Sequence, residues 1–442
     1  VADTQFSVDR GFYEDAFDLE ITTATDAATI LYTLDGSAPE RGSIFTPDHG
    51  TVYNEPVRIE TTATVRALAY KGGSEPTNID THTYLFIDDI AKQPADPEGW
   101  PSDWGRDGEV GGIIPSDYEM DPRVIAGTIP DYGIREALLD IPTLSIAMDP
   151  EDFVGSNGIY TNPNPSNRAV YERACSLELI YPDGEKGFQE NCGVEIHGNS
   201  SRRPFRMQKH SMRVSFKSKY GVSRLRFPFF KDSPIENYNK IVLRACFTDS
   251  WGLASWGPGR YRPNDSQYIR DMWMKHSMRD MGHDFTNGNF MHLYVNGLYW
   301  GLFNPAEKME AETLVTHLGG TEEDYDINDD FDTAPIDGTS ASWNEMHSLS
   351  RRDLKVEENY LALREMLDLE NFADYMLLHF FGDAEDWPHH NGHAMRNRGA
   401  GEPFKFYVWD QEIVLDNFRV ARYGSRDSGR PGGLFQELRD SK

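Results

Sequence analysis

Cysteine is scarce in this sequence of 442 residues, which contains Cys175, Cys192 and Cys246. Three cysteines exclude a disulfide-dense scaffold, and their spacing excludes a zinc ribbon. Cys175 and Cys192 lie on either side of a Pro-Asp-Gly turn at residues 182–184, each within a strand-like run. Two interpretations therefore stay open: a disulfide bridge between these two residues, or three buried thiols.

Positive charge and long apolar runs are also in short supply. Lys and Arg number 43 against 72 Asp and Glu, which gives a formal net charge of −29. Such a surface repels phosphate backbones and anionic lipid, so we expect neither a nucleic-acid partner nor peripheral membrane binding. No run of about 18 apolar residues occurs, so we expect no membrane span. Hydrophobic residues nevertheless make up 38 %, enough for a sizeable core in two or three domains.

The residue pattern divides the chain into three parts. Residues 1–88 carry short runs of β-branched and aromatic residues between Gly and Pro clusters, which predicts a small all-β sandwich. Residues 89–137 are rich in Pro, Asp and Gly, which indicates a linker or an ordered wrap. Residues 138–442 mix strand-like and helical periodicities, so the predicted fold class is α+β.

Several elements of the C-terminal part are well marked by their residues. The segment 292–303 predicts a hairpin, because its central Asn-Gly dipeptide supplies the two positive-φ residues of a type I′ turn. Residues 268–281 and 371–381 repeat apolar side chains at helical spacing, which predicts two helices. Residues 404–409 alternate as a strand that ends at Asp410.

The segment between the second helix and this strand carries the residue types of phosphoryl transfer. Kinases need a carboxylate near the acceptor hydroxyl, and an Asn and a second Asp that hold metal ions beside the phosphates. Asp386 and Asn391 have the five-residue spacing of the protein-kinase catalytic loop, and Asp410 follows 19 residues later. The alternative is that Asp386 and Asn391 are turn residues that cap their own backbone.

Two further interpretations concern metal binding. His389 and His393 have the i, i+4 spacing of zinc ligands on a helix, but Pro388 and Gly392 disfavour a helix there, so histidines at the surface or at the edge of the core are favoured. An acidic stretch could hold calcium, but it lacks the Gly and the final Glu of an EF-hand loop, which favours a solvated acidic loop. Its members are Asp324, Asp326, Asn328, Asp329, Asp330 and Asp332.

A run of cations stands out in so acidic a chain. The Gly-containing turn at residues 198–201 follows a strand and can present backbone N–H groups to phosphate, while basic side chains on the next strand could reach the same oxygens. The alternative is a solvated basic patch that balances nearby carboxylates. The run comprises Arg202, Arg203, Arg206, Lys209, Arg213, Lys217 and Lys219.

These motifs carry two resemblances to known families. Residues 32–39 and 65–69 resemble the small β-sandwich appended to chitobiases and β-hexosaminidases, which is usually an accessory spacer. Residues from about 140 to 442 resemble the spore-coat protein H (CotH) kinase-like family, whose members look like highly diverged protein kinases. The motifs behind the second resemblance are Gly198-Asn199-Ser200-Ser201, Lys209-His210-Ser211-Met212-Arg213, Val242-Leu243-Arg244, Tyr268-Ile269-Arg270-Asp271, Tyr294-Val295-Asn296-Gly297-Leu298-Tyr299-Trp300-Gly301-Leu302, Glu307-Lys308, Asp386-Trp387 with Asn391, and Trp409-Asp410.

The CotH resemblance implies roles for the residues of the C-terminal motifs. Asp386 would be the catalytic or metal-linked Asp, and Asn391 and Asp410 would be the metal ligands. Glu412 stands where the family often has a second Asp. The implied fold is a highly diverged protein-kinase-like domain preceded by the small sandwich.

The same resemblance implies a phosphate-binding role for the earlier motifs. Lys209 would contact the phosphates, supported by Glu307. Arg213 flanks Lys209 as a second cation for the same role, and the turn from Gly198 to Ser201 would cover the phosphates.

The function implied is that of an atypical protein kinase, secreted, extracellular or at the cell surface. It would transfer the γ-phosphate of ATP to Ser or Thr of a protein acceptor or of itself. ATP and Mg²⁺ or Mn²⁺ would be its cofactors, with Ca²⁺ as a further candidate. The alternative is a non-catalytic surface or scaffold protein, in which the kinase-like fold binds a surface polysaccharide or a surface protein.

Overall fold

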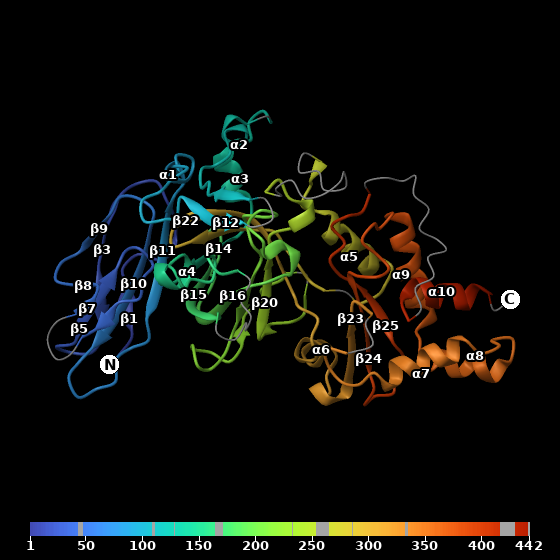
Figure 1. Cartoon of the computed structure of the whole chain (residues 1–442). Coiled ribbons are helices and arrows are strands. Elements are labelled where there is room, and N and C mark those ends of the chain that lie inside the picture. The colour runs from blue at the N-terminus through green and yellow to red at the C-terminus, as the bar shows by residue number, and fades with distance from the viewer. Residues whose placement is uncertain are drawn as a thin grey trace. The chain divides into compact units, whose positions relative to one another are not determined.

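The computed structural model of this chain describes residues 1–42, 47–107, 111–127, 129–163, 171–231, 233–252, 265–284, 286–331, 335–415 and 429–440. Both α and β elements are present, and the chain forms two compact units (Figure 1). None of the helices in the described ranges has the length and apolar character to cross a membrane. The first unit comprises Val1–Phe227, Val242–Ala245 and Asn289–Pro305, and the second comprises Pro228–Ile241, Cys246–Gly288 and Ala306–Lys442.

The N-terminal part of the first unit is built of short strands, as the sequence predicted. Its main sheet has the order β2-β11-β10-β5-β8, in which β2 and β11 are parallel. Apolar side chains fill a core around Val65, Ala67 and Tyr84, which are fully buried. The strands are β1 (Thr4–Phe6), β2 (Gly11–Tyr13), β3 (Phe17–Leu19), β4 (Ile21–Thr23), β5 (Thr29–Thr33), β6 (Glu40–Arg41), β7 (Pro47–His49), β8 (Thr51–Val52), β9 (Val57–Ile59), β10 (Ala63–Tyr70) and β11 (Asp80–Phe86).

The segment predicted as a linker or wrap contains short elements and packs against the hairpin at 292–303. Gln93 Nε2 donates to Tyr299 O at 3.1 Å, and Tyr299 N donates to Gln93 Oε1 at 2.8 Å. The rings of Trp100 and Trp300 lie 5.5 Å apart. The elements are α1 (Ile87–Ile90), β12 (Asp103–Asp107), β13 (Gly112–Pro115), α2 (Pro122–Ala126) and α3 (Ile134–Asp140).

Seven strands close into a barrel in the order β14-β15-β16-β17-β20-β22-β21. The predicted hairpin forms β21 and β22, and Asn296 and Gly297 both take positive φ (49° and 80°), which confirms the two-residue turn. The barrel strands are β14 (Thr143–Ala147), β15 (Arg173–Ile180), β16 (Gln189–Ile196), β17 (Met212–Ser215), β20 (Lys240–Arg244), β21 (Met291–Val295) and β22 (Leu298–Ala306); α4 (Pro150–Phe153) and β18 (Leu225–Arg226) lie between them in sequence.

The cysteines of the barrel follow the second of the two interpretations left open by the sequence. Cys175 on β15 and Cys192 on β16 occupy opposite positions in the ladder, and their Sγ atoms lie 3.5 Å apart without a bond. Together with Cys246 they are buried thiols. The hydrogen bond from Cys175, together with burial, raises the pKa of the Cys192 thiol well above its usual value.

A buried polar contact joins the N-terminal sheet to the barrel. Glu178 on β15 is fully buried, accepts hydrogen bonds from the backbone N–H (3.1 Å) and the hydroxyl of Thr83 on β11, and pairs with Arg10 at 3.0 Å. Burial raises the pKa of Glu178, and the charge of Arg10 opposes that rise. A Cβ added to Gly36 would lie 2.3 Å from Asn296 Oδ1 in the hairpin turn. The N-terminal module therefore packs directly on the barrel.

The second unit contains the three-stranded antiparallel sheet β23-β24-β25, against which α9 packs (Figure 1). Its core gathers around the buried side chains of Trp343, Phe372 and Tyr375. The predicted helices and strand correspond to α5, α9 and β25, with every bound within two residues of the prediction. The elements are β19 (Asn237–Tyr238), α5 (Arg270–Asp280), α6 (Ala311–Leu318), β23 (Tyr325–Asp329), α7 (Ala341–Ser350), α8 (Glu357–Arg364), α9 (Leu369–Phe381), β24 (Gly392–Asn397), β25 (Lys405–Val408) and α10 (Pro431–Asp440).

Candidate active site

Asp386 lies in the loop between α9 and β24, and its neighbour Trp387 fixes this loop to the helix. Trp387 is buried, its Nε1 donates to Tyr375 Oη at 2.9 Å, and its ring stacks on His379 with centroids 4.6 Å apart. Tyr375 and His379 lie one turn apart on the buried face of α9. The apolar periodicity of this helix thus supplies the anchor that holds Asp386 in place.

The structure brings together the three residues that the sequence assigned to phosphoryl transfer; the residues 383–410 that contain them are named the catalytic segment after that predicted role. Gly392 pairs with Val408 in the β24–β25 ladder, so Asn391 and Asp410 lie at the same end of this hairpin. Asn391 Nδ2 donates to Asp386 Oδ2 at 3.4 Å. The kinase-type spacing and the family resemblance together pointed to Asp386, Asn391 and Asp410, and the roles assigned to them stay predictions.

The side chain of Gln411 ties the two ends of this segment to each other. Its Nε2 donates to the backbone carbonyl of Asn391 at 2.6 Å and to that of Trp409 at 3.1 Å. The loop before β24 and the loop after β25 therefore share one hydrogen-bonding side chain, which fixes the separation between Asn391 and Asp410.

The backbone at these positions is left-handed. Asp383, Asn391 and Asp410 have φ of 47°, 62° and 58°. Non-glycine residues rarely adopt this region, Asn and Asp do so most readily, and such residues cluster at functional sites. The unusual backbone therefore marks the same segment as the residue types do.

A buried ion pair supports the loop that carries Asp410. Asp271 Oδ1 accepts the backbone N–H of Gln411 at 2.8 Å, and Asp271 Oδ2 lies 2.8 Å from Lys275 Nζ on the next turn of α5. Lys275 is fully buried, and its Nζ lies 4.9 Å from the centre of the Trp409 ring. Asp271 belongs to a motif of the sequence resemblance, but the sequence did not assign it to the site.

Glu412, which stands where the family often has a second Asp, fixes another turn. Its Oε2 accepts the backbone N–H (2.7 Å) and the hydroxyl (2.9 Å) of Thr248. The adjacent Asp249 pairs with Arg270 at 2.6 Å, and burial raises the pKa of Asp249 to about 6. Glu412 thus carries a structural contact in this chain.

The acidic stretch predicted as a solvated loop is instead the strand β23, so that prediction was wrong for residues 325–329. Asp326 is fully buried, where it binds the guanidinium of Arg398 and accepts the Thr339 N–H at 2.8 Å. These partners lie far from Asp326 in sequence, so the acidic pattern around Asp326 gave no sign that its charge would be buried and compensated. Asp332 lies outside the described residues.

The end of β23 reaches the catalytic segment, which the sequence did not reveal. Asp329 Oδ1 lies 3.1 Å from His393 Nδ1, and Asp330 Oδ1 accepts the Asn391 N–H at 2.7 Å. The sequence had suggested calcium binding for these residues only as the weaker alternative to a solvated acidic loop. Their actual neighbours are the residues of the kinase-type motif.

The zinc interpretation of His389 and His393 does not fit the structure. Residues 392–397 form β24, so the two histidines do not share a helix. His393 is buried beside Asp329, and His389 Nε2 lies 3.7 Å from Asp386 Oδ1. Pro388 and Gly392 had indicated this break. Across the described ranges, no group of three or more His, Cys, Asp or Glu is arranged to hold a metal.

The predicted phosphate-binding residues of the first unit are held by local contacts. A Cβ on Gly198 (φ 111°) would lie 2.3 Å from Ser201 Oγ, so the turn requires glycine there. Lys209 Nζ donates to Leu302 O at 3.0 Å, and Arg213 pairs with Glu195 on the neighbouring strand at 2.5 Å. Their role toward a nucleotide stays a prediction.

Two further cations of the run pair with a nearby carboxylate. Lys217 and Lys219 both pair with Glu172, at 2.5 and 3.0 Å. They therefore balance a nearby carboxylate, as the basic-patch interpretation expects.

Glu307 is a buried hub of the second unit. Its Oε2 accepts the backbone N–H and the side-chain amide of Asn287, both at 2.8 Å, and its Oε1 lies 2.8 Å from His317 Nε2. Both carboxylate oxygens are thus engaged within this unit. Because Lys209 belongs to the other unit, the implied support of Lys209 by Glu307 stays a prediction.

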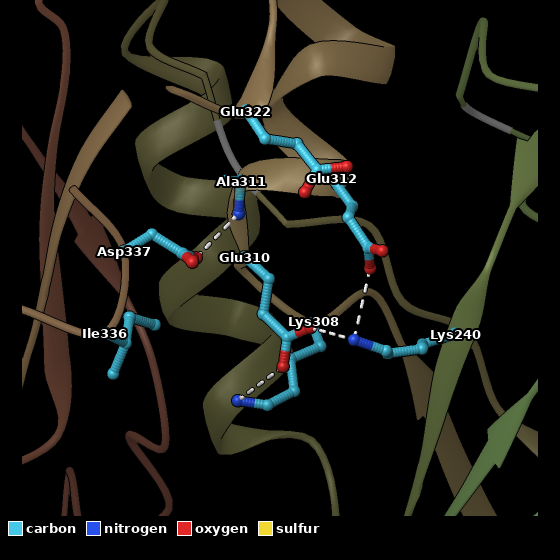
Figure 2. A pocket seen from close by; sticks show the side chains of 8 residues that line it. All are labelled: Lys240, Lys308, Glu310, Ala311, Glu312, Glu322, Ile336 and Asp337. Carbon is cyan, nitrogen blue, oxygen red and sulfur yellow. Dashed lines mark hydrogen bonds and ion pairs between the residues drawn. The ribbon is translucent and has the colours of Figure 1, made fainter. Parts of the chain in front are cut away.

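A charged cavity of about 360 Å³ lies at the start of α6 (Figure 2). Lys240 pairs with Glu310 at 2.6 Å and Glu312 at 3.1 Å, and Lys308 pairs with Glu310 at 3.3 Å. Because each lysine is already neutralised by a glutamate, this cavity offers no net attraction for a phosphate. No residue of the predicted site lines it.

The oxygen donors of the catalytic segment suit a hard divalent cation. Asn391 and Asp410 offer amide and carboxylate oxygens, and Asp386 lies in hydrogen-bond contact with the first of these. Mg²⁺ is commonly held by one or two carboxylates together with the phosphates of its substrate, so a set of two or three protein ligands is sufficient. The residue types therefore suit a divalent cation, and binding of a nucleotide belongs to the proposed function.

Known family models match both the C-terminal and the N-terminal part of the chain. A family model described as CotH kinase protein matches residues 194–437, and one described as Fn3 associated matches residues 19–84. No curated protein matches the chain. The first match contains Asp386, Asn391 and Asp410, and the second covers most of the N-terminal strands.

Proposed function

The chain belongs to the CotH kinase protein family, and from that membership we propose that it is an atypical protein kinase. It transfers the γ-phosphate of ATP to Ser or Thr of a protein acceptor, or of itself, with Mg²⁺ or Mn²⁺. We place this activity outside the cell or at its surface. The convergence of Asp386, Asn391 and Asp410 at one end of the β24–β25 hairpin carries the proposal.

The three residues divide two tasks between them in this proposal. Asn391 and Asp410 would hold the divalent cation, which neutralises charge on the phosphates when it is bound. Asp386 would orient the acceptor hydroxyl and take its proton. The contact between Asn391 Nδ2 and Asp386 Oδ2 fixes that carboxylate relative to the cation-binding amide.

The test is transfer of labelled γ-phosphate with Mg²⁺, Mn²⁺ or Ca²⁺ supplied singly. We expect Asp410→Ala to reduce transfer at least about 100-fold, because it removes one of the side chains that would hold the cation. Circular dichroism checks that the variant folds. The matched control is Asp280→Ala, an exposed acid at the end of α5 that pairs with Arg279. Equal transfer by wild type and Asp410→Ala would overturn the proposal.

A second outcome would favour the non-catalytic alternative. If wild type transfers no label and ATP with Mn²⁺ does not raise its melting temperature, the fold serves binding. Capture of a surface polysaccharide or a surface protein by the purified chain would then identify the partner.

A further inference from the structure

The acidic residue that follows β23 is hydrogen-bonded to the catalytic segment through its backbone and its side chain. Asp330 N donates to Gly392 O at 3.0 Å, and Asp330 Oδ1 accepts the Asn391 N–H at 2.7 Å. The ladder between β23 and β24 pairs Asp329 with His393, so this contact continues the sheet by one residue. Asp330 is thus held beside the start of β24 by the turn that directly follows β23.

The contact acts on a strained part of the backbone. Asn391 has φ of 62°, and Asp330 itself has φ of 53°. A left-handed residue keeps its conformation only where its surroundings hold it. For Asn391 those surroundings are Asp330 on its N–H and Gln411 on its carbonyl, at 2.7 and 2.6 Å.

The backbone of Asn391 in turn sets the direction of its side chain. The amide Nδ2 donates to Asp386 Oδ2 at 3.4 Å, which leaves Oδ1, the atom that can bind a cation, out of that contact. If the N–H of Asn391 loses its acceptor, the left-handed conformation is no longer fixed from that side. The amide then loses its defined position relative to Asp386.

We infer that Asp330 is a positioning residue of the active site, which holds Asn391 in the conformation that binds the metal–nucleotide complex. This inference rests on the proposed function. The carboxylate of Asp330 acts through one hydrogen bond, and its second oxygen lies 3.9 Å from His390 Nδ1. A hydrogen-bond acceptor at this place, rather than a negative charge, is what the role requires.

Three substitutions distinguish whether position 330 must provide a hydrogen-bond acceptor or a negative charge. Asp330→Ala removes both, Asp330→Asn keeps an acceptor oxygen without the charge, and Asp330→Glu keeps the charge but moves the carboxylate. The readout is the Mn²⁺ concentration that gives half of the rise in melting temperature at saturating ATP. We expect Asp330→Ala and Asp330→Glu to need about 10-fold more Mn²⁺, and Asp330→Asn to stay within about 3-fold of wild type, as for residues that orient metal ligands.

The control is Asp324→Ala, an acid of the same segment that binds Thr321 away from the site. It is expected to keep the wild-type response to Mn²⁺. Should Asp330→Ala fail to fold, the contrast between Asn and Glu still decides. The inference would be overturned if Asp330→Glu needed no more Mn²⁺ than wild type, or if Asp330→Asn needed as much Mn²⁺ as Asp330→Glu. If the wild type shows no rise in melting temperature with Mn²⁺ and ATP, the inference about Asp330 is overturned and the proposed function is weakened. If the wild type responds, the Asp330 variants test the inference separately from the proposed function.

Discussion

Single residues in this site take conformations and charge states that proteins usually avoid. Asp383, Asn391 and Asp410 are left-handed, at a cost of roughly 1 kcal/mol each. Lys275 is buried completely beside Asp271. Such costs persist where neighbouring groups hold the residue in place, and here hydrogen bonds and an ion pair do so.

The buried histidine on α9 predicts an acid-sensitive fold. Burial lowers the pKa of His379 from 6.5 to about 3. Because the folded state disfavours the charged ring, the stabilisation is present above pH 6.5 and is lost as pH falls toward 3. We expect this to cost roughly 4 kcal/mol of unfolding free energy by pH 3. Urea unfolding at several pH values should show that the unfolding free energy falls less steeply toward acid pH in His379→Gln than in wild type. Equal slopes in the two proteins would contradict this role of His379.

At the scale of elements, the site depends on how strand ends meet. The end of β23, the start of β24 and the end of β25 lie together because the three strands form one antiparallel sheet. Gly392 allows this approach, since a Cβ there would lie 2.5 Å from Phe331 Cζ and 2.6 Å from Tyr375 Oη. The tight packing of Gly392 against two aromatic side chains thus lies directly beside Asn391.

Gly392→Ala should therefore disturb both packing and transfer. We expect a loss of about 1–3 kcal/mol of unfolding free energy in urea, because the added methyl group forces the aromatic side chains apart. Phosphate transfer should fall with it, since the neighbouring Asn391 moves. Gly72→Ala is the control, with no atom near its added Cβ and an expected change within about 0.5 kcal/mol. If Gly392→Ala keeps the wild-type stability, the rings of Phe331 and Tyr375 can move aside without a cost in free energy.

The sequence predicted those elements and residues whose signals are local. The Asn-Gly turn and the helices α5 and α9 follow from spacing within short segments, whereas the choice of Asp386, Asn391 and Asp410 also needed the family resemblance. Asp330 and Asp271 escaped prediction because their partners Asn391 and Gln411 lie 61 and 140 residues away. Such contacts are created by sheet pairing and helix packing, which no short window of sequence contains.

At the scale of the molecule, the first unit is held together by charge as well as by apolar contact. Glu178 on the barrel is buried beneath Thr83 and Arg10, which come from the N-terminal module 95 and 168 residues earlier. A buried carboxylate requires such partners, because its desolvation would otherwise cost several kcal/mol. The module therefore contributes to the stability of the barrel.

Arg10→Ala tests this dependence. We expect a loss of about 3–5 kcal/mol, because Glu178 would remain buried without its cation. Hydrogen exchange followed by mass spectrometry should increase in β15 as well as in β11. The control is Arg58→Ala, whose exposed pair with Asp18 should contribute less than about 1 kcal/mol. Faster exchange confined to the N-terminal strands would show that the barrel does not depend on the module.

The close approach of Gly36 to Asn296 has a consequence for how such chains evolve. Any side chain at position 36 would collide with the hairpin turn, and a Cβ on Gly297 would approach Thr62 to 3.3 Å. An N-terminal module exchanged alone by recombination would have to supply a glycine at position 36 that fits a turn about 260 residues away. We therefore expect the module and the barrel to be inherited as one piece, and positions 36, 62, 296 and 297 to vary together among relatives.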